Sequence, residues 1–98
     1  MTVNKNREGN ALCVSVEGRL DTVTAPELEA SLKEEFEGLA DLTIDLGELE
    51  YISSAGLRVL LLAQKTMSKQ GKMVVRNVNE TVKEIFDVTG FSDILTIE

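Results

Sequence analysis

Segments with two different apolar periods alternate along this chain, and this alternation restricts the fold more than any other feature. Residues 11–18 ("ALCVSVEG") and 42–46 ("LTIDL") carry an apolar side chain at every second position, which is typical of a half-buried strand. Between them, Leu28, Leu32 and Phe36 recur at helical spacing. Strands that alternate with helices imply right-handed crossover units and a largely parallel sheet.

Capping residues mark where the helices are expected to begin and end. Residues 24–27 ("TAPE") match a capping box with proline in the first turn, and Gly38 marks the expected end of this first helix. A second helix is predicted over about 54–70, with Gly71 as its stop.

A third helix is predicted to begin after Asn79, whose side chain would cap it, and to end at Gly90, which is placed for a left-handed C-cap. We expect Phe91 to pack back on the last turns of this helix. Its predicted apolar residues are Val82, Ile85, Phe86 and Val88.

The remaining strands complete the predicted fold. Residues 41–52 read as one strand and its exit turn, 72–78 ("KMVVRNV") as a strand, and 93–98 ("DILTIE") as a short closing strand. A polar edge strand within 2–9 would form a hairpin with the strand that follows it. We therefore expect a single α/β domain over 1–98, with a mixed, mostly parallel sheet of four to five strands and three main helices, in the order ββαβαβαβ.

Charge and residue usage argue against several functions. The net charge is −7, from ten Lys and Arg against seventeen Asp and Glu, and no basic cluster is present, so direct nucleic-acid binding is not expected. The chain has no histidine and one cysteine, Cys13, so zinc sites and Ser-His-Asp or Cys-His catalysis lack their residues. We predict a protein that is not an enzyme and that uses no cofactor.

The start of the chain does not resemble a signal peptide, and no stretch resembles a membrane span. The start, "MTVNKNREGN", is polar, and the longest apolar stretch, "VLLLA" at 59–63, is far too short to span a bilayer. A single cysteine favours a reducing compartment. We expect a cytoplasmic protein without membrane association.

The segment 51–61 ("YISSAGLRVLL") places Ser53 and Ser54 at the junction between a predicted strand and a predicted helix. Two interpretations stay open from these residues. The serines could simply cap the helix, since serine is a preferred N-cap. Alternatively, Ser54 could be a sterically open hydroxyl that accepts a phosphate, because the first turn of a helix has unpaired N–H groups and partial positive charge. Gly56, unfavourable in a helix, suggests a close approach of the backbone to another element.

An acidic cluster of Asp21, Asp41 and Asp45 is a third hypothesis, because carboxylates bind magnesium in phosphoacceptor receiver domains. Receiver domains also have adjacent acidic residues after their first strand and a lysine near the last strand. This chain has neither, so the sequence disfavours the metal site.

Three stretches carry a family resemblance that covers nearly the whole chain. Residues 45–64 ("DLGELEYISSAGLRVLLLAQ") resemble the central segment of the STAS domain of bacterial anti-anti-sigma factors, in which Asp-Ser-Ser/Thr-Gly-Leu opens a helix. Residues 16–32 are similar to the family's Gly-x-Leu/Ile-Asp turn and first helix. Residues 71–95 are similar to its C-terminal half.

The resemblance implies roles for particular residues. Ser54, two residues before Gly56, matches the serine that is phosphorylated in the family, and Gly56 and Leu57 match the pair that opens the helix. Asp21 matches the acidic residue near the phosphorylation site. The residues expected to bind a partner are Asp21, Ser53, Ser54, Ala55, Gly56, Leu57 and Arg58.

The resemblance also implies a function, that of an anti-sigma factor antagonist acting by partner switching. Unphosphorylated, the protein would bind an anti-sigma factor with serine kinase activity, free a sigma factor and so control transcription indirectly. Phosphorylation of Ser54 by that kinase would release it, and a serine phosphatase would reverse the modification.

Two positions depart from the family pattern. Ser53 stands where aspartate is usual, which makes Ser53 a secondary candidate for phosphorylation, and Ala55 stands where serine or threonine is usual. These departures favour an alternative function, a binding or scaffold module of the same fold, without phosphorylation, in a signalling or transport complex.

Overall fold

The computed structural model describes residues 1–98, which form five strands and four helices. The strands are β1 (Thr2–Glu8), β2 (Ala11–Leu20), β3 (Asp41–Asp45), β4 (Leu49–Ile52) and β5 (Lys72–Arg76). The helices are α1 (Ala25–Lys33), α2 (Ser54–Ser68), α3 (Glu80–Thr89) and α4 (Phe91–Ile94). The expected α/β fold with a mixed sheet is confirmed.

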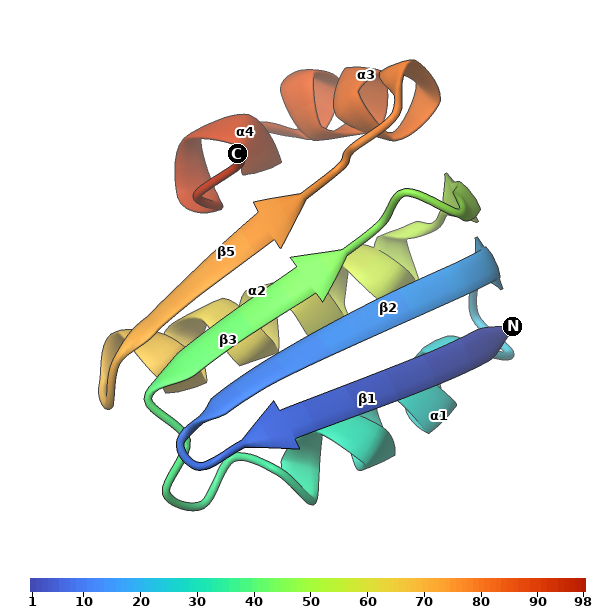
Figure 1. Cartoon of the computed structure of the whole chain (residues 1–98). Helices are drawn as coiled ribbons and strands as arrows, with labels where there is room; N and C mark the ends of the chain where they lie inside the picture. Colours follow the sequence, from blue (N-terminus) through green and yellow to red (C-terminus); the bar gives the residue numbers. More distant parts are fainter.

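The sheet has the order β1-β2-β3-β5, and β4 pairs with the second half of β2. Only β1 and β2 are antiparallel; the β2–β3, β3–β5 and β2–β4 pairs are all parallel. In Figure 1, α1 and α2 lie behind the sheet, whereas α3 and α4 lie beyond β5. The near face of β1, β2 and β3 therefore carries no helix.

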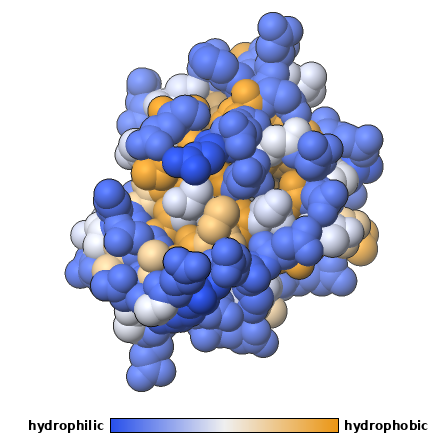
Figure 2. Space-filling model, viewed as in Figure 1, coloured by the Kyte–Doolittle hydropathy of each residue, from blue (hydrophilic) through white to orange (hydrophobic).

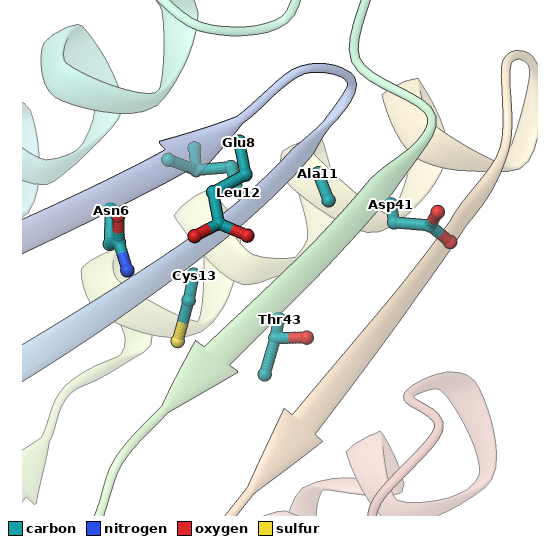
Figure 3. Close-up of a pocket in the computed structure, with 7 residues that line it drawn as sticks. All are labelled: Asn6, Glu8, Ala11, Leu12, Cys13, Asp41 and Thr43. Carbon is teal, nitrogen blue, oxygen red and sulfur yellow. The ribbon is translucent and has the colours of Figure 1, made fainter.

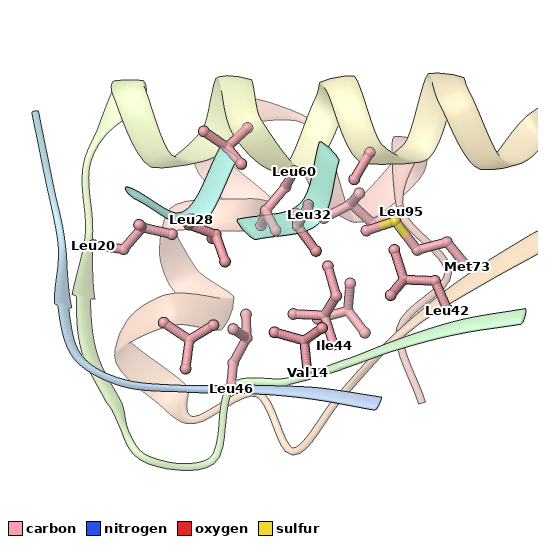
Figure 4. Close-up of a cluster of buried hydrophobic side chains, with 14 of the residues drawn as sticks. Val14, Leu20, Leu28, Leu32, Leu42, Ile44, Leu46, Leu60, Met73 and Leu95 are labelled. Atoms are coloured by element: carbon pink, nitrogen blue, oxygen red, sulfur yellow. The ribbon is translucent and has the colours of Figure 1, made fainter. Parts of the chain in front are cut away.

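Alternate residues of the strands build the core, as their period predicts. Val14 of β2 and Leu42 and Ile44 of β3 are buried and face Leu28 and Leu60 of the helices (Figure 4). On the opposite side of the sheet the side chains are mostly polar, and in Figure 2, which views this face, hydrophilic residues predominate.

The segment 41–52 contains two strands, so the prediction of one strand and an exit turn was wrong. The carboxylate of Asp45 accepts a hydrogen bond from the backbone N–H of Gly47 at 2.8 Å, and the N–H of Leu49 bonds the carbonyl of Leu46 at 3.1 Å. This tight turn ends β3 and starts β4, which moves across to pair with β2 instead of β5.

The predicted C-terminal strand was also wrong. Residues 91–94 form the single helical turn α4, and the N–H of Leu95 bonds the carbonyl of Phe91 at 2.9 Å. Leu95, which follows this turn, is buried. Of the three residues after it, Ile97 forms an isolated parallel bridge to Val75. The rest of the predicted order holds, but the chain reads ββαββαβαα.

Helix α1 ends at Lys33, not at Gly38. The carbonyls of Glu35 and Glu37 accept hydrogen bonds from the Arg7 guanidinium at 2.7 and 3.1 Å. These bonds to a distant side chain hold the segment in turns. Leu39 lies beyond the helix, three residues after Phe36, and its side chain is still buried in the core.

The predicted capping box at Thr24 does not form, because the Thr24 side chain makes no cap bond. Its hydroxyl instead accepts from the N–H of Asp21 and donates to the carbonyl of Arg19, at 2.8 and 2.9 Å. The other two helices follow the prediction more closely. α2 begins at Ser54, and Asn79 caps α3 by accepting from the N–H of Val82 at 2.9 Å.

Candidate functional site

The two serines have different positions in the structure. Ser53 is extended and half-buried. Its N–H bonds the carbonyl of Leu20 at 2.9 Å, and its hydroxyl accepts from the N–H of Gly56 at 3.5 Å. Ser53 is thus the N-cap of α2. Ser54 is the first helical residue; it is exposed and its hydroxyl makes no hydrogen bond within the chain. Capping therefore accounts for one serine and leaves the other hydroxyl free.

Gly56 allows the start of α2 to press against the sheet. A Cβ atom at this position would lie 2.7 Å from Cγ of Leu20 and 2.8 Å from Cγ1 of Ile52, closer than carbon atoms can approach without a shift. The expected close approach is therefore present. It fixes the first turn of α2, and with it Ser54, at the ends of β2 and β4.

The remaining expected site residues on α2 divide between core and surface. Leu57 is buried in the core and Ala55 is half-buried, whereas Arg58 is exposed. Ser54, Leu57 and Arg58 border one shallow hollow of about 390 Å³, together with Thr89 and Phe91. The free hydroxyl thus opens onto a depression between α2 and the end of α3.

The loop after β2 places Asp21 beside the junction of β4 and α2. Its neighbour Leu20 pairs with Ile52, and the carbonyl of Leu20 accepts a hydrogen bond from the N–H of Ser53. One carboxylate oxygen of Asp21 accepts from the N–H groups of Val23 and Thr24, at 3.0 and 3.1 Å. The bond from the Thr24 backbone, above all, lowers the pKa of Asp21 below its ordinary value, so the carboxylate is ionised at neutral pH. The structure therefore brings a fixed negative charge next to the two serines.

The exposure of three apolar residues was not foreseen from the sequence. Val23 is 82% exposed on the Asp21 loop, and Val88, predicted to be one of the apolar residues of its helix, is 81% exposed. Ile94 is also exposed, and Phe91 is half-buried against the core, as expected. The position of Val23 between two threonines ("TVT") could have indicated that its side chain is exposed. Val23, Val88 and Ile94 are the large apolar side chains that the chain exposes.

A second depression, of about 190 Å³, lies on the helix-free face of the sheet (Figure 3). It is lined by short and polar side chains, among them Cys13, Asn6 and Thr43 from three neighbouring strands. Asp41 borders it, but Asp21 lies elsewhere, and no group of three potential metal ligands occurs in the chain. No helix is long and apolar enough to cross a membrane.

These features define an α/β domain that presents a free serine hydroxyl at the start of a helix. Residues 2–98 match the family model of the STAS domain, and the chain belongs to the STAS domain family. The expected family resemblance is confirmed.

Relatives in this family carry names that describe sigma-factor regulation. The anti-sigma-B factor antagonist of Bacillus subtilis is 34% identical over 98 residues, which covers 99% of this chain and 90% of that protein. An anti-sigma factor antagonist from Mycobacterium paratuberculosis, of known crystal structure, is 26% identical with a TM-score of 0.88, covering 98% of this chain and 83% of that one. The anti-sigma factor antagonist SpoIIAA in its unphosphorylated form shares the fold, with a TM-score of 0.85 at 14% identity, over 99% of this chain and 88% of that one.

Proposed function

We propose that this protein is an anti-sigma factor antagonist whose binding is switched by phosphorylation of Ser54. Unphosphorylated, it binds an anti-sigma factor with serine kinase activity in the cytoplasm and so frees a sigma factor. The names of its relatives support the class of partner. The single observation that supports the switch is the exposed hydroxyl of Ser54, which has no partner within the chain.

The proposed modification is a simple transfer. The kinase moves the γ-phosphoryl group of ATP to Oγ of Ser54, so that a new P–O bond replaces the bond to ADP and the hydroxyl proton passes to a base of the kinase. A serine phosphatase hydrolyses the ester and restores the hydroxyl. This chain supplies only the acceptor, held in a fixed first turn by the close packing of Gly56.

Charge and size explain how this modification would release a partner. A phosphate adds about −1.5 to −2 charges at neutral pH. Val23 is exposed on the Asp21 loop, and Phe91 borders the same hollow as Ser54. Both side chains suit an apolar contact that excludes water. An unpaired charge buried in such a contact costs several kcal/mol, which corresponds to more than a hundredfold in affinity. The domain itself need not change conformation.

The binding test uses purified protein and the anti-sigma factor kinase encoded nearest to it in the same genome. We expect Ser54→Ala to bind like the wild type in ADP and to stay bound in ATP, and Ser54→Asp to bind at least tenfold more weakly, measured by titration calorimetry. Thr81→Asp is the matched control, because Thr81 is also an exposed hydroxyl in the first turn of a helix, at the far end of α3.

Peptide mass spectrometry after incubation with the kinase and ATP identifies the acceptor. Phosphate on Ser54 supports the proposal. Phosphate on Ser53 alone, or equal affinity of Ser54→Asp and wild type, contradicts it.

A second candidate function is a binding or scaffold module without a phosphorylation switch. Ser53 and Ala55, which depart from the family pattern, favour it. In that case a stable partner would lack kinase activity, and its affinity would be the same for Ser54→Asp, Ser54→Ala and the wild type.

A further inference from the structure

Arg58 is a cation without a partner in an acidic protein. It is exposed and takes part in none of the seven ion pairs of the chain. Helix α2 itself contains no acidic residue that could approach it. Glu29 of α1 borders a hollow together with Arg58, but it pairs with Lys33 at 3.4 Å. No carboxylate of the chain therefore lies within ion-pair distance of this guanidinium.

The position of Arg58 relative to Ser54 is set by the helix. Residues four apart lie on the same face, one turn from each other, with about 5–6 Å between their Cβ atoms. Ser54 and Arg58 accordingly border the same hollow, beside Leu57 and Phe91. A phosphate on Oγ of Ser54 would extend into this hollow, within reach of the long arginine side chain.

The carboxylate of Asp21 is engaged by its own loop, where it accepts from the N–H groups of Val23 and Thr24. As an anion it would repel a phosphate, so Arg58 is the charged side chain of the site that suits one. Arginine also matches the geometry of phosphate oxygens with paired N–H donors.

We propose that Arg58 binds the phosphate of phosphorylated Ser54 within the same molecule. This inference rests on the proposed function, because it requires Ser54 to carry the phosphate. The modification then changes two groups of the docking surface together: a hydroxyl becomes an anion, and a free guanidinium becomes engaged.

The test places phosphoserine at position 54 during protein synthesis and follows the phosphate by ³¹P NMR as a function of pH. A free phosphoserine has its second pKa near about 6. We expect this pKa to be higher by roughly half a unit in Arg58→Gln than in the wild-type background at low salt, because a cation about 5 Å away stabilises the dianion by that amount. In about 1 M NaCl the difference should vanish.

Matched variants separate charge from other effects. Arg58→Lys should restore most of the shift, because it keeps the cation. Lys65→Gln removes a different exposed cation of α2, eleven residues from Ser54, and should leave the titration as in the wild type. Equal phosphate pKa values in the wild type and Arg58→Gln at low salt would overturn the proposal, as would an equal shift in Lys65→Gln.

This experiment can fail independently of the proposed function. The phosphate is installed without any kinase, so the titration tests Arg58 alone. If the titration shows the shift but the kinase does not modify Ser54, the proposed function fails and the property of Arg58 stands. If the kinase modifies Ser54 but the titration shows no shift, the proposed function stands and the proposed role of Arg58 fails.

Discussion

Replacement of Gly56 by alanine tests whether the start of α2 is fixed by close packing. The new Cβ would lie 2.7 Å from Cγ of Leu20 and 2.8 Å from Cγ1 of Ile52, two buried side chains. Such overpacking typically costs about 1–3 kcal/mol, whereas the better helix propensity of alanine returns about 1 kcal/mol. Because both distances are below 3.0 Å, the cost should lie in the upper part of that range, and we expect a net loss of about 1–2 kcal/mol in the free energy of unfolding. For a chain of this size that corresponds to a decrease in Tm of roughly 5–15 °C.

Urea denaturation followed by circular dichroism measures this loss. Gly71→Ala gives a graded comparison, because its Cβ would lie 1.9 Å from the carbonyl oxygen of Ala40, a backbone atom that cannot rotate away, so this variant should be the less stable of the two. Ser54→Ala is the control, since Ser54 is exposed on the same helical turn, and it should unfold close to the wild type. The reasoning is refuted if Gly56→Ala is as stable as the wild type, or more stable.

Two further predictions concern polar contacts that the fold depends on. Asn79→Ala removes the cap on the N–H of Val82 and a hydrogen bond to the carbonyl of Leu49 at 2.6 Å, and should cost about 1–2 kcal/mol in urea denaturation; an unchanged midpoint would contradict this. Because the hydrogen bond from the Thr24 backbone, above all, lowers the folded-state pKa of Asp21, the unfolded state binds more protons in mildly acid solution. The contribution of Asp21 to the free energy of unfolding should therefore be present above about pH 5 and be lost as the pH falls through the folded-state pKa. The free energy of unfolding of Asp21→Asn should decline less steeply than that of the wild type between about pH 5 and 3. Equal declines of the free energy of unfolding in the wild type and Asp21→Asn would exclude this contribution of Asp21.

The cap of α3 and its left-handed end, which depend on local hydrogen bonds, could be predicted from the sequence, whereas the capping box predicted at Thr24 does not form. Asn79 caps α3 and Gly90 is left-handed, with φ of 83°, because both effects involve only residues within one turn. The end of α1 could not be predicted in this way. The turns that follow it involve Arg7, from a strand distant in sequence, whose guanidinium binds the carbonyls of Glu35 and Glu37.

The same distinction holds for the candidate site. Ser54 was placed correctly at the start of a helix, because the change of apolar period at residues 51–57 is a local signal. Val88 was named among the apolar residues of its helix, but the structure leaves it exposed while Val82 and Phe86 are buried. The contribution of Phe91 and Thr89 to the hollow depends on how α4 folds back, which no short segment specifies.

The lack of any internal bond to the hydroxyl of Ser54 has a consequence for how such proteins diverge. A side chain that the fold does not use can be exchanged with little effect on folding. Lineages can therefore acquire, lose or relocate a regulated position by a single codon change, without compensating substitutions elsewhere. Natural selection at residue 54 should then follow the choice of binding partner, independently of the scaffold that carries it.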